Sequence, residues 1–178
     1  ENVYDFSLGN PSVPAPEAVR TSMKRILDEK NSLYVHGYMS NAGYEEVREA
    51  VAASLNRRFE TDFSGADILM TVGAAGGLNV ALRTLLDPGD EVICFAPYFG
   101  EYRNYVLNYQ GKLVVIPPDT ETFQLNLDLL DAQINERTKA LIINNPNNPT
   151  GVVYSAETLD RLQAVLAAAE ARIGHSIY

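Results

Sequence analysis

The chain gathers its most constrained residues in one stretch, Asn144-Asn145-Pro146-Asn147-Asn148-Pro149-Thr150-Gly151. Two closely spaced Asn-Pro bonds restrict φ twice and bias the preceding asparagines toward extended backbone. A loop held in this way can aim an asparagine amide at a fixed polar atom of a ligand. An asparagine-rich surface turn remains the alternative, but a plain turn does not need so many constraints.

Two further segments carry residue types that suit a planar, phosphorylated ligand. The run from Gly73 to Gly77 leads into a helical pattern, and its small side chains let backbone amides approach an anion at the positive end of a helix. Close packing of a strand on a helix explains such a run equally well, and the run is not a Walker sequence. Tyr98, Phe99 and Tyr102 could offer a ring for stacking, although the residues alone favour places in the core.

The elements around these segments indicate an α/β fold. From residue 67 onward, short apolar runs alternate with helical patterns, which is typical of a parallel sheet built through crossover connections. The expected strands cover residues 68–72, 91–95, 113–116 and 140–143. In such sheets, ligands collect beyond the carboxyl ends of the strands, where all three segments would lie.

Apolar residues at helical spacing predict the intervening helices. We expect one helix after Pro16, and a long loop at 31–43. Ser155 is expected to cap the last helix and Gly174 to stop it, with Ile177-Tyr178 opening another strand. The other expected helices cover residues 47–59, 77–86, 101–109, 128–134.

Composition excludes several classes of function. The 178 residues carry a net charge of −9, which disfavours nucleic acid and anionic membranes as partners. A single cysteine, Cys94, and two histidines, His36 and His175, provide neither a disulfide framework nor an ordinary zinc site. No apolar run approaches the roughly 20 residues that span a bilayer, and the acidic start lacks the basic region of a secretory signal. These features predict a soluble, cytoplasmic protein without a metal.

The sequence resembles the class I and II aminotransferases, pyridoxal-phosphate enzymes of fold type I. Residues 145–151 are similar to the family motif Asn-Pro-x-Asn-Pro-Thr-Gly. Residues in the right order support this resemblance, namely Leu8-Gly9-Asn10-Pro11, Tyr38, Gly43 with Arg48-Glu49, the small-residue run, and Asp87-Pro88-Gly89-Asp90-Glu91-Val92 before Pro97-Tyr98.

The resemblance implies a fold and a place in it. It implies a three-layer α/β/α large domain with a mainly parallel sheet, incomplete on its C-terminal side. Residues 1–43 would form an N-terminal segment with a helix and active-site loops, and residues 44–178 part of the large cofactor-binding domain. The C-terminal small domain would lie outside this chain, because family members are more than twice as long.

The resemblance also assigns roles to residues. Asn148 would hydrogen-bond the phenolic oxygen of pyridoxal 5'-phosphate, and Phe99 would stack on its ring. Gly73, Ala74 and Ala75 would meet the phosphate. Tyr38 would reach the cofactor of the neighbouring subunit in a homodimer. Gly9 would lie by the substrate carboxylate.

The resemblance implies transfer of an amino group between an amino acid and a 2-oxo acid, in amino acid metabolism and biosynthesis. No catalytic residue is expected in this chain, since the Schiff-base lysine would lie downstream. Lys24 and Lys30 fall on or after the first helix, and Lys112 and Lys139 precede their strands. A partial chain of this kind is expected to be inactive alone.

Two alternatives remain open. A pyridoxal-phosphate lyase or synthase of the same fold would share these cofactor contacts. A noncatalytic ligand-sensing or interaction domain would keep the fold alone. The residues at hand leave the amino acid and the oxo acid undetermined.

Overall fold

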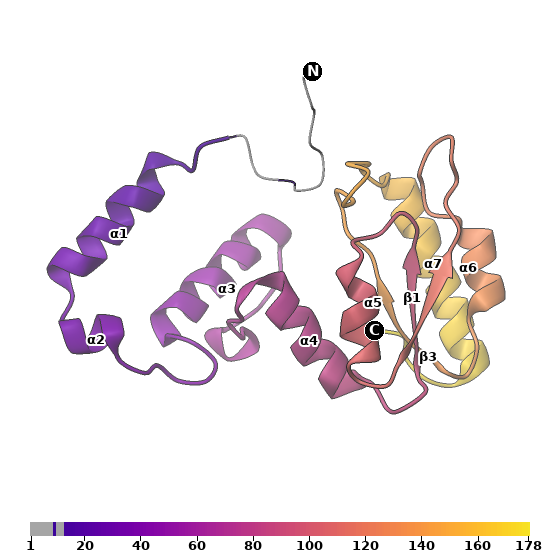
Figure 1. Cartoon of the computed structure of the whole chain (residues 1–178), viewed down its shortest axis with the longest axis horizontal. Helices are drawn as coiled ribbons and strands as arrows, with labels where there is room; N and C mark the ends of the chain where they lie inside the picture. Colours follow the sequence, from indigo (N-terminus) through magenta and orange to yellow (C-terminus); the bar gives the residue numbers. More distant parts are fainter. Residues whose placement is uncertain (1–8, 10–12) are drawn as a thin grey trace, which may run out of the picture. The chain divides into compact units, whose positions relative to one another are not determined.

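A computed structural model describes residue 9 and residues 13–178 (Figure 1). The chain divides into two compact units, residues 1–70 and 71–178, and each is considered by itself. The proposed domain division at residues 43 and 44 stays a prediction. Among the described residues, no helix has the length and apolar character needed to cross a membrane.

The first unit is helical. Arg48 Nη1 donates to Gly65 O at 2.7 Å, and Gly65 N donates to Glu49 Oε1 at 3.1 Å. A Cβ at Gly65 would lie 2.5 Å from that carboxylate oxygen, so a larger residue there would displace the Glu49 side chain. The Arg48-Glu49 pair noted in the sequence thus holds the backbone at Gly65, after the third helix, by two hydrogen bonds. The elements of this unit are α1 (Glu17–Glu29), α2 (Ser32–His36), α3 (Glu45–Phe59) and the 3₁₀ turn η1 (Gly65–Asp67).

The second unit contains a parallel three-stranded sheet in the order β2-β1-β3, which confirms the α/β fold. The central strand pairs Glu91 with Lys112 on one side and Val92 with Ala140 on the other. The elements are α4 (Gly73–Leu85), β1 (Glu91–Phe95), α5 (Glu101–Leu107), β2 (Lys112–Ile116), α6 (Leu127–Gln133), β3 (Thr138–Ile142) and α7 (Ala156–Ile173).

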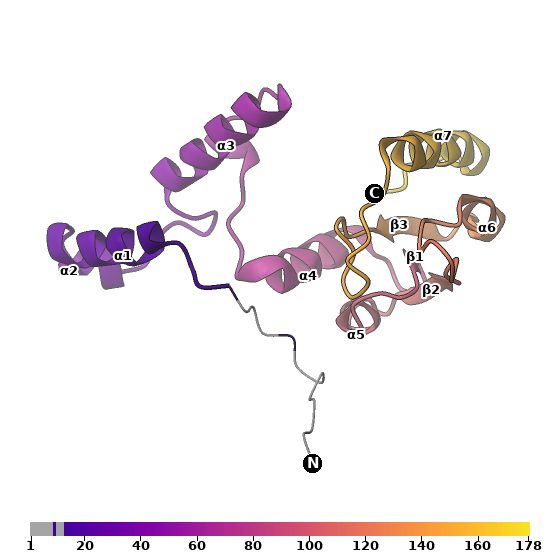
Figure 2. The same cartoon turned by 90° about the horizontal axis from the view of Figure 1, so that it is seen from above.

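Helices cover both faces of this sheet, so the second unit has three layers (Figure 2). Alternate residues of β1 point to opposite faces, as a strand requires. Val92 packs with Leu82 of α4 and Val106 of α5. Ile93 packs on the opposite face with Leu130 of α6, in the cluster that also includes residues of α7. A fully buried central strand between two apolar layers is the arrangement expected of a doubly covered parallel sheet.

The end of the chain continues the sheet. Gly174 adopts the left-handed conformation at φ 81° and ends α7, as expected. Tyr178 N donates to Lys139 O at 3.1 Å, and Leu141 N donates to Tyr178 O at 2.8 Å. This pattern is that of a parallel neighbour and lies on the edge of β3 away from β1. The prediction that Ile177-Tyr178 opens another strand is therefore supported by backbone pairing.

Two local predictions are wrong. Residues 68–72 do not form a strand: Ile68 is extended, and Met70 N bonds only to Ala42 O, while α4 begins at Gly73 rather than Gly77. A strand needs hydrogen bonds to a neighbouring strand, and this extended segment has none among the described residues. The apolar pattern alone therefore gave the wrong prediction. The loop expected at 31–43 contains α2, which Asn31 caps by accepting from Leu33 N at 2.7 Å.

A buried carboxylate joins the amino ends of the strands. Glu91 Oε1 accepts from Lys112 Nζ at 2.8 Å, and Glu91 Oε2 accepts from Asn135 Nδ2 at 2.9 Å. Burial by itself raises the pKa of Glu91, but the hydrogen bonds from Lys112 and Asn135 and the charges of Lys112 and Arg137 outweigh burial and lower it. The ionised carboxylate is thus the form that the fold stabilises.

We expect Glu91→Gln to lower the free energy of unfolding by about 1–2 kcal/mol at neutral pH, because the ion pair with Lys112 is lost. A pKa that is depressed in the folded state contributes stability above the unfolded value of roughly 4.3 and loses it as the pH falls further. The difference between the parent and the variant should therefore shrink below that pH. Urea unfolding at several pH values measures it, and a difference that grows in acid would contradict this explanation.

Candidate functional site

The strand order places a switch point between β1 and β3. The chain leaves β1 for β2 on one side and returns to β3 on the other, so the loops after β1 and β3 diverge from neighbouring carboxyl ends. A switch point of this kind is where open α/β sheets bind ligands. The loops that carry Phe99 and Asn148 are these two loops.

The asparagine-rich loop is held by two of its own asparagines. Asn145 Oδ1 accepts from Tyr154 N at 3.0 Å. Asn147 N donates to Val152 O at 2.9 Å, and Gly151 N donates to Asn147 O at 2.7 Å. Asn148 is exposed, and among the described residues no hydrogen bond uses its side chain. The loop therefore fixes its backbone while leaving the amide of Asn148 free for a ligand.

One hydrogen bond connects this loop to the loop after β1. Asn147 Nδ2 donates to Pro97 O at 3.1 Å, across 50 residues of sequence, and also to Thr150 Oγ1 at 2.9 Å. The two loops at the switch point are thus joined directly rather than only through the sheet.

The aromatic residues after β1 divide between core and surface. Tyr102 is buried, and its pKa is raised because burial disfavours the phenolate. Its ring stacks with Tyr98 at 6.3 Å and meets Phe99 edge-on at 5.8 Å. Phe99 itself is 40% exposed. The core placement that the residues favoured holds for Tyr102, whereas Phe99 retains a free face.

The small-residue run forms the first turn of α4. Val72 precedes it without a side-chain cap, and Gly73 adopts φ 66°. Gly76 N reaches Val72 O at 3.3 Å, but no bond among the described residues uses the amides of Ala74 and Ala75. Amides at the first turn of a helix lack partners within the helix and suit an anion.

Convergence of the three loops on one pocket stays a prediction. The structure brings the loops of Phe99 and Asn148 together through Asn147. Among the described residues, no hydrogen bond links residues 73–75 to either loop.

The remaining predicted contacts lie in the first unit. Tyr38 is fully exposed in the loop after α2, beside a cavity of about 400 Å³ that Val35, Met39 and Tyr44 help to line. Gly9 is exposed, while Leu8, Asn10 and Pro11 lie outside the described residues. The roles of Tyr38 and Gly9 stay predictions.

The four lysines lie outside the loops at the carboxyl ends of the strands, although Lys112 and Lys139 fall within the first two residues of their strands rather than before them. Lys24 is in α1 and Lys30 follows it, with its ammonium 5.0 Å from the ring centre of Tyr34. Lys112 is the first residue of β2 and Lys139 the second of β3, so both lie at amino ends of strands. Cys94 is buried in β1, which raises the pKa of its thiol to about 12, and so it is no nucleophile at neutral pH.

Two residues of the site escaped the sequence interpretation. Asn147 stands at the open position of the motif, yet its side chain joins the two loops. Tyr102 belongs to the core, as its residue type suggests, but its ring also contacts Phe99. The spacing from Tyr98 and Phe99 to Tyr102, four and three residues around a helix start, is the signal that would have found the second contact.

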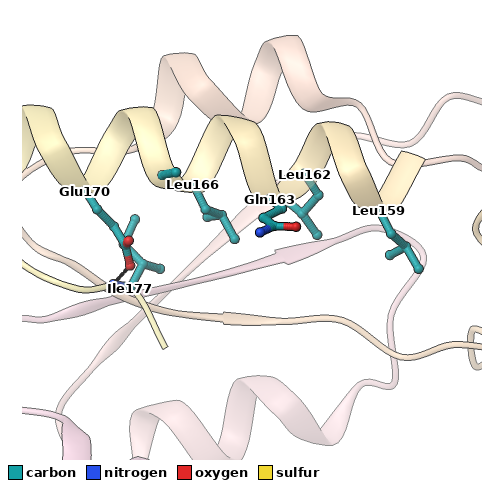
Figure 3. Close-up of a pocket in the computed structure, with 7 residues that line it drawn as sticks. Leu159, Leu162, Gln163, Leu166, Glu170 and Ile177 are labelled. Carbon is teal, nitrogen blue, oxygen red and sulfur yellow. Dashed lines mark hydrogen bonds between the residues drawn. The ribbon is translucent and has the colours of Figure 1, made fainter. Parts of the chain in front are cut away.

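A cavity elsewhere has a different character. About 360 Å³ lies along α7, lined mostly by apolar side chains of which Figure 3 labels Leu159, Leu162 and Leu166 together with Ile177. The carboxylate of Glu170 there already accepts from Ile177 N at 2.7 Å (Figure 3). Gln163 is its other polar lining residue, and this hollow follows the apolar face of α7 rather than the carboxyl ends of the strands.

Comparison with known proteins agrees with the geometry. The chain is 36% identical over 163 residues to an aspartate aminotransferase of Thermotoga maritima, covering 91% of this chain and 42% of the relative. It is 32% identical over 163 residues to an aspartate aminotransferase of Sulfolobus acidocaldarius, covering 90% of this chain and 40% of the relative. The chain thus spans about 40% of the length of the curated relatives that it matches.

Solved structures show the same likeness. An aminotransferase from Eubacterium rectale has a TM-score of 0.96 at 45% identity, covering 99% of this chain and 44% of the other. An aspartate aminotransferase of Thermus thermophilus has a TM-score of 0.83 at 32% identity, covering 97% of this chain and 43% of the other. The family model for aminotransferase class I and II matches residues 1–173. The chain belongs to the class I and II aminotransferases.

Proposed function

We propose that the whole protein is a pyridoxal-phosphate-dependent aminotransferase, and that residues 71–178 supply one side of its cofactor site. The observation that carries this proposal is the pair of loops at the switch point, one with a free aromatic face and the other with a free amide. Both loops are fixed by hydrogen bonds before any ligand arrives, as a preorganised site requires.

The free groups of the described residues fit this cofactor. Ala74 and Ala75 present amides without partners at the first turn of a helix, which suits a phosphate. Phe99 offers a ring that is 40% exposed, which suits a flat heterocycle. Asn148 offers an amide donor, which suits a phenolic oxygen. These donors and this apolar face suit the phosphate, the ring face and the phenolic oxygen of pyridoxal phosphate, and its Schiff-base lysine is expected downstream.

When bound, the protonated ring of the cofactor accepts electrons from the amino acid as its α proton leaves. In our proposal the residues of this chain bind and orient the ring for that step. Residues 73–75 hold the phosphate, Phe99 covers one face of the ring, and Asn148 donates to the phenolic oxygen and stabilises its ionised form. Gly9 lies by the carboxylate of the substrate in this proposal.

The substrates that we propose are an amino acid and a 2-oxo acid, taken by a cytoplasmic homodimer. Support comes from relatives whose names state aspartate or prephenate as substrates. The residues that would choose among amino acids are not among the cofactor contacts assigned here, so the proposal stops at the substrate class.

Separate half-reactions test this function. The complete protein with bound cofactor should change its visible spectrum when mixed with an amino acid, and regain the first spectrum with a 2-oxo acid. Only a transaminase cycles in this way. Loss or replacement of a substrate group without this cycle would favour a lyase or synthase, and no spectral response to any amino acid would favour a ligand-sensing domain.

The proposed dimer carries its own prediction. Tyr38 is fully exposed in a single chain, and an exposed aromatic beside a cavity is typical of a surface that a partner covers. Tyr38→Phe in the complete protein should weaken cofactor binding about 10- to 100-fold, the value of one hydrogen bond to a charged group, without dissociating the dimer. Equilibrium dialysis and sedimentation measure the two effects.

Mixing subunits provides the control. A dimer of one Tyr38→Phe subunit and one Asn148→Ala subunit should contain one site with both defects and one intact site if Tyr38 serves the partner. Two sites with one defect each, and no intact site, would instead show that Tyr38 acts within its own subunit.

A further inference from the structure

We infer that Asn147, at the open position of the motif, is a positioning residue that sets the asparagine loop against the aromatic loop. The inference rests on the proposed function, because it concerns how the chain aims Asn148 and Phe99 at one ligand. Asn147 does not offer its own amide to the ligand, since its side chain bonds to protein groups.

The amide of Asn147 has both of its hydrogens engaged. An Asn side chain has two donors on its nitrogen, and here one meets Pro97 O at 3.1 Å and the other meets Thr150 Oγ1 at 2.9 Å. The second bond fixes the rotamer, so that the first can reach only the loop after β1. Asn147 is half-buried whereas Asn148 is exposed, which fits a structural amide beside a free one.

The backbone around Asn147 is fixed as well. Asn147 N donates to Val152 O at 2.9 Å, and Asn147 O accepts from Gly151 N at 2.7 Å. Asn147 therefore connects Pro97 to a loop whose backbone is itself cross-bonded. Asn148 is the next residue, and Phe99 lies two residues beyond Pro97, so a shift at this bond moves one relative to the other.

Few residue types can make the contacts of Asn147, although the motif allows any residue at this position. The amide of Asn147 is a planar group with two hydrogens, and it reaches both Pro97 O and Thr150 Oγ1. Asn147→Ala removes both bonds. Asn147→Asp keeps the size but replaces the donor with an oxygen that repels the Pro97 carbonyl. Both variants should loosen the link between the loops, and the second should do so without creating a void.

Asn145 offers a matched control in the same loop. Its side-chain oxygen accepts one bond of ordinary length, from Tyr154 N at 3.0 Å, and that bond stays on the β3 side and does not reach the aromatic loop. Asn145→Ala should lower stability to a similar extent without uncoupling the two loops.

The decisive experiment is a double-mutant cycle in the complete protein, with pyridoxal phosphate as the probe. We expect Asn147→Ala to raise the dissociation constant about tenfold, as loss of a hydrogen bond that holds a binding group would. Phe99→Leu should then weaken binding at least threefold less in the Asn147→Ala background than in the parent. In the Asn145→Ala background the effect of Phe99→Leu should be the same as in the parent, within twofold.

Hydrogen exchange of the cofactor-free protein gives a readout that does not depend on binding. Asn147→Ala and Asn147→Asp should both speed exchange in a peptide covering residues 96–103, whose protected amides include Ala96 and Tyr102. Asn145→Ala should speed exchange only near residue 154. If the parent binds no cofactor, the proposed function fails and exchange alone decides whether Asn147 couples the loops. Additive affinities together with unchanged exchange at residues 96–103 would overturn the inference.

Discussion

Asn148→Ala in the complete protein should raise the pKa of the cofactor's phenolic group by about one to two units. A hydrogen bond to a charged acceptor contributes roughly 1.5–3 kcal/mol, and one unit corresponds to about 1.36 kcal/mol. Asn148 is exposed, and no bond among the described residues uses its amide, so the full donor strength is available to a ligand. Because the bond favours the ionised phenolate, its loss shifts the titration upward.

Absorbance followed from pH 5 to 10 measures this shift. Asn108→Ala is the control, since Asn108 is an exposed asparagine at the end of α5, away from the carboxyl ends of the strands. The control should titrate like the parent. A titration of Asn148→Ala that coincides with that of the parent would show that Asn148 does not contact the phenolic oxygen.

The 178-residue polypeptide by itself should neither transaminate nor carry a covalently attached cofactor at a specific lysine. Lys112 and Lys139 lie at amino ends of strands, five and four residues from the loops at the opposite edge, and Lys112 is paired with Glu91 at 2.8 Å. Lys24 lies in α1, and Lys30 lies against the ring of Tyr34. A positioned base contributes about 10²–10⁴-fold to rate, and this chain offers no lysine for that role at the switch point.

Borohydride reduction, which makes a bond between cofactor and lysine permanent, followed by peptide mapping measures the attachment. Single-turnover rates are compared with those of free cofactor, because the cofactor reacts slowly with amino acids unaided. The complete protein serves as the positive control. Specific labelling of one of the four lysines, with turnover well above free cofactor, would contradict this prediction.

The sequence predicted the sheet better than it predicted the segment before it. Strand β1 has the expected bounds, Glu91–Phe95, because a short apolar run between Asp and Pro residues is too short for a helix and favours a buried strand. Residues 68–72 have the same texture but form no strand, because pairing depends on a neighbour that a local pattern does not reveal. The short helix α2 depends on the cap by Asn31, a local signal outweighed by the surrounding Tyr, Ser and Gly residues.

The site could be predicted as residue types and not as connections. The two prolines of the asparagine loop predicted that its backbone would be restricted. Which asparagine would remain free was not, because Asn145, Asn147 and Asn148 are chemically identical and differ only in what surrounds them. Long-range partners such as Pro97 O, 50 residues from Asn147, are set by the fold and have no trace in local spacing.

The Glu91 network also selects the register of the sheet. Its carboxylate holds Lys112 of β2 and Asn135 just before β3, both near 3 Å, so a slip of either strand by one residue, roughly 3.3 Å, would break a bond. The same slip would turn the strand's side chains over and move the loop at its far end by one residue. Glu91 thereby fixes the strand register from the amino end of β1, roughly 17 Å from the loops at the carboxyl ends of the strands. A change of cofactor affinity in Glu91 variants would report misaligned loops, because Glu91 lies at the amino end of β1, away from those loops.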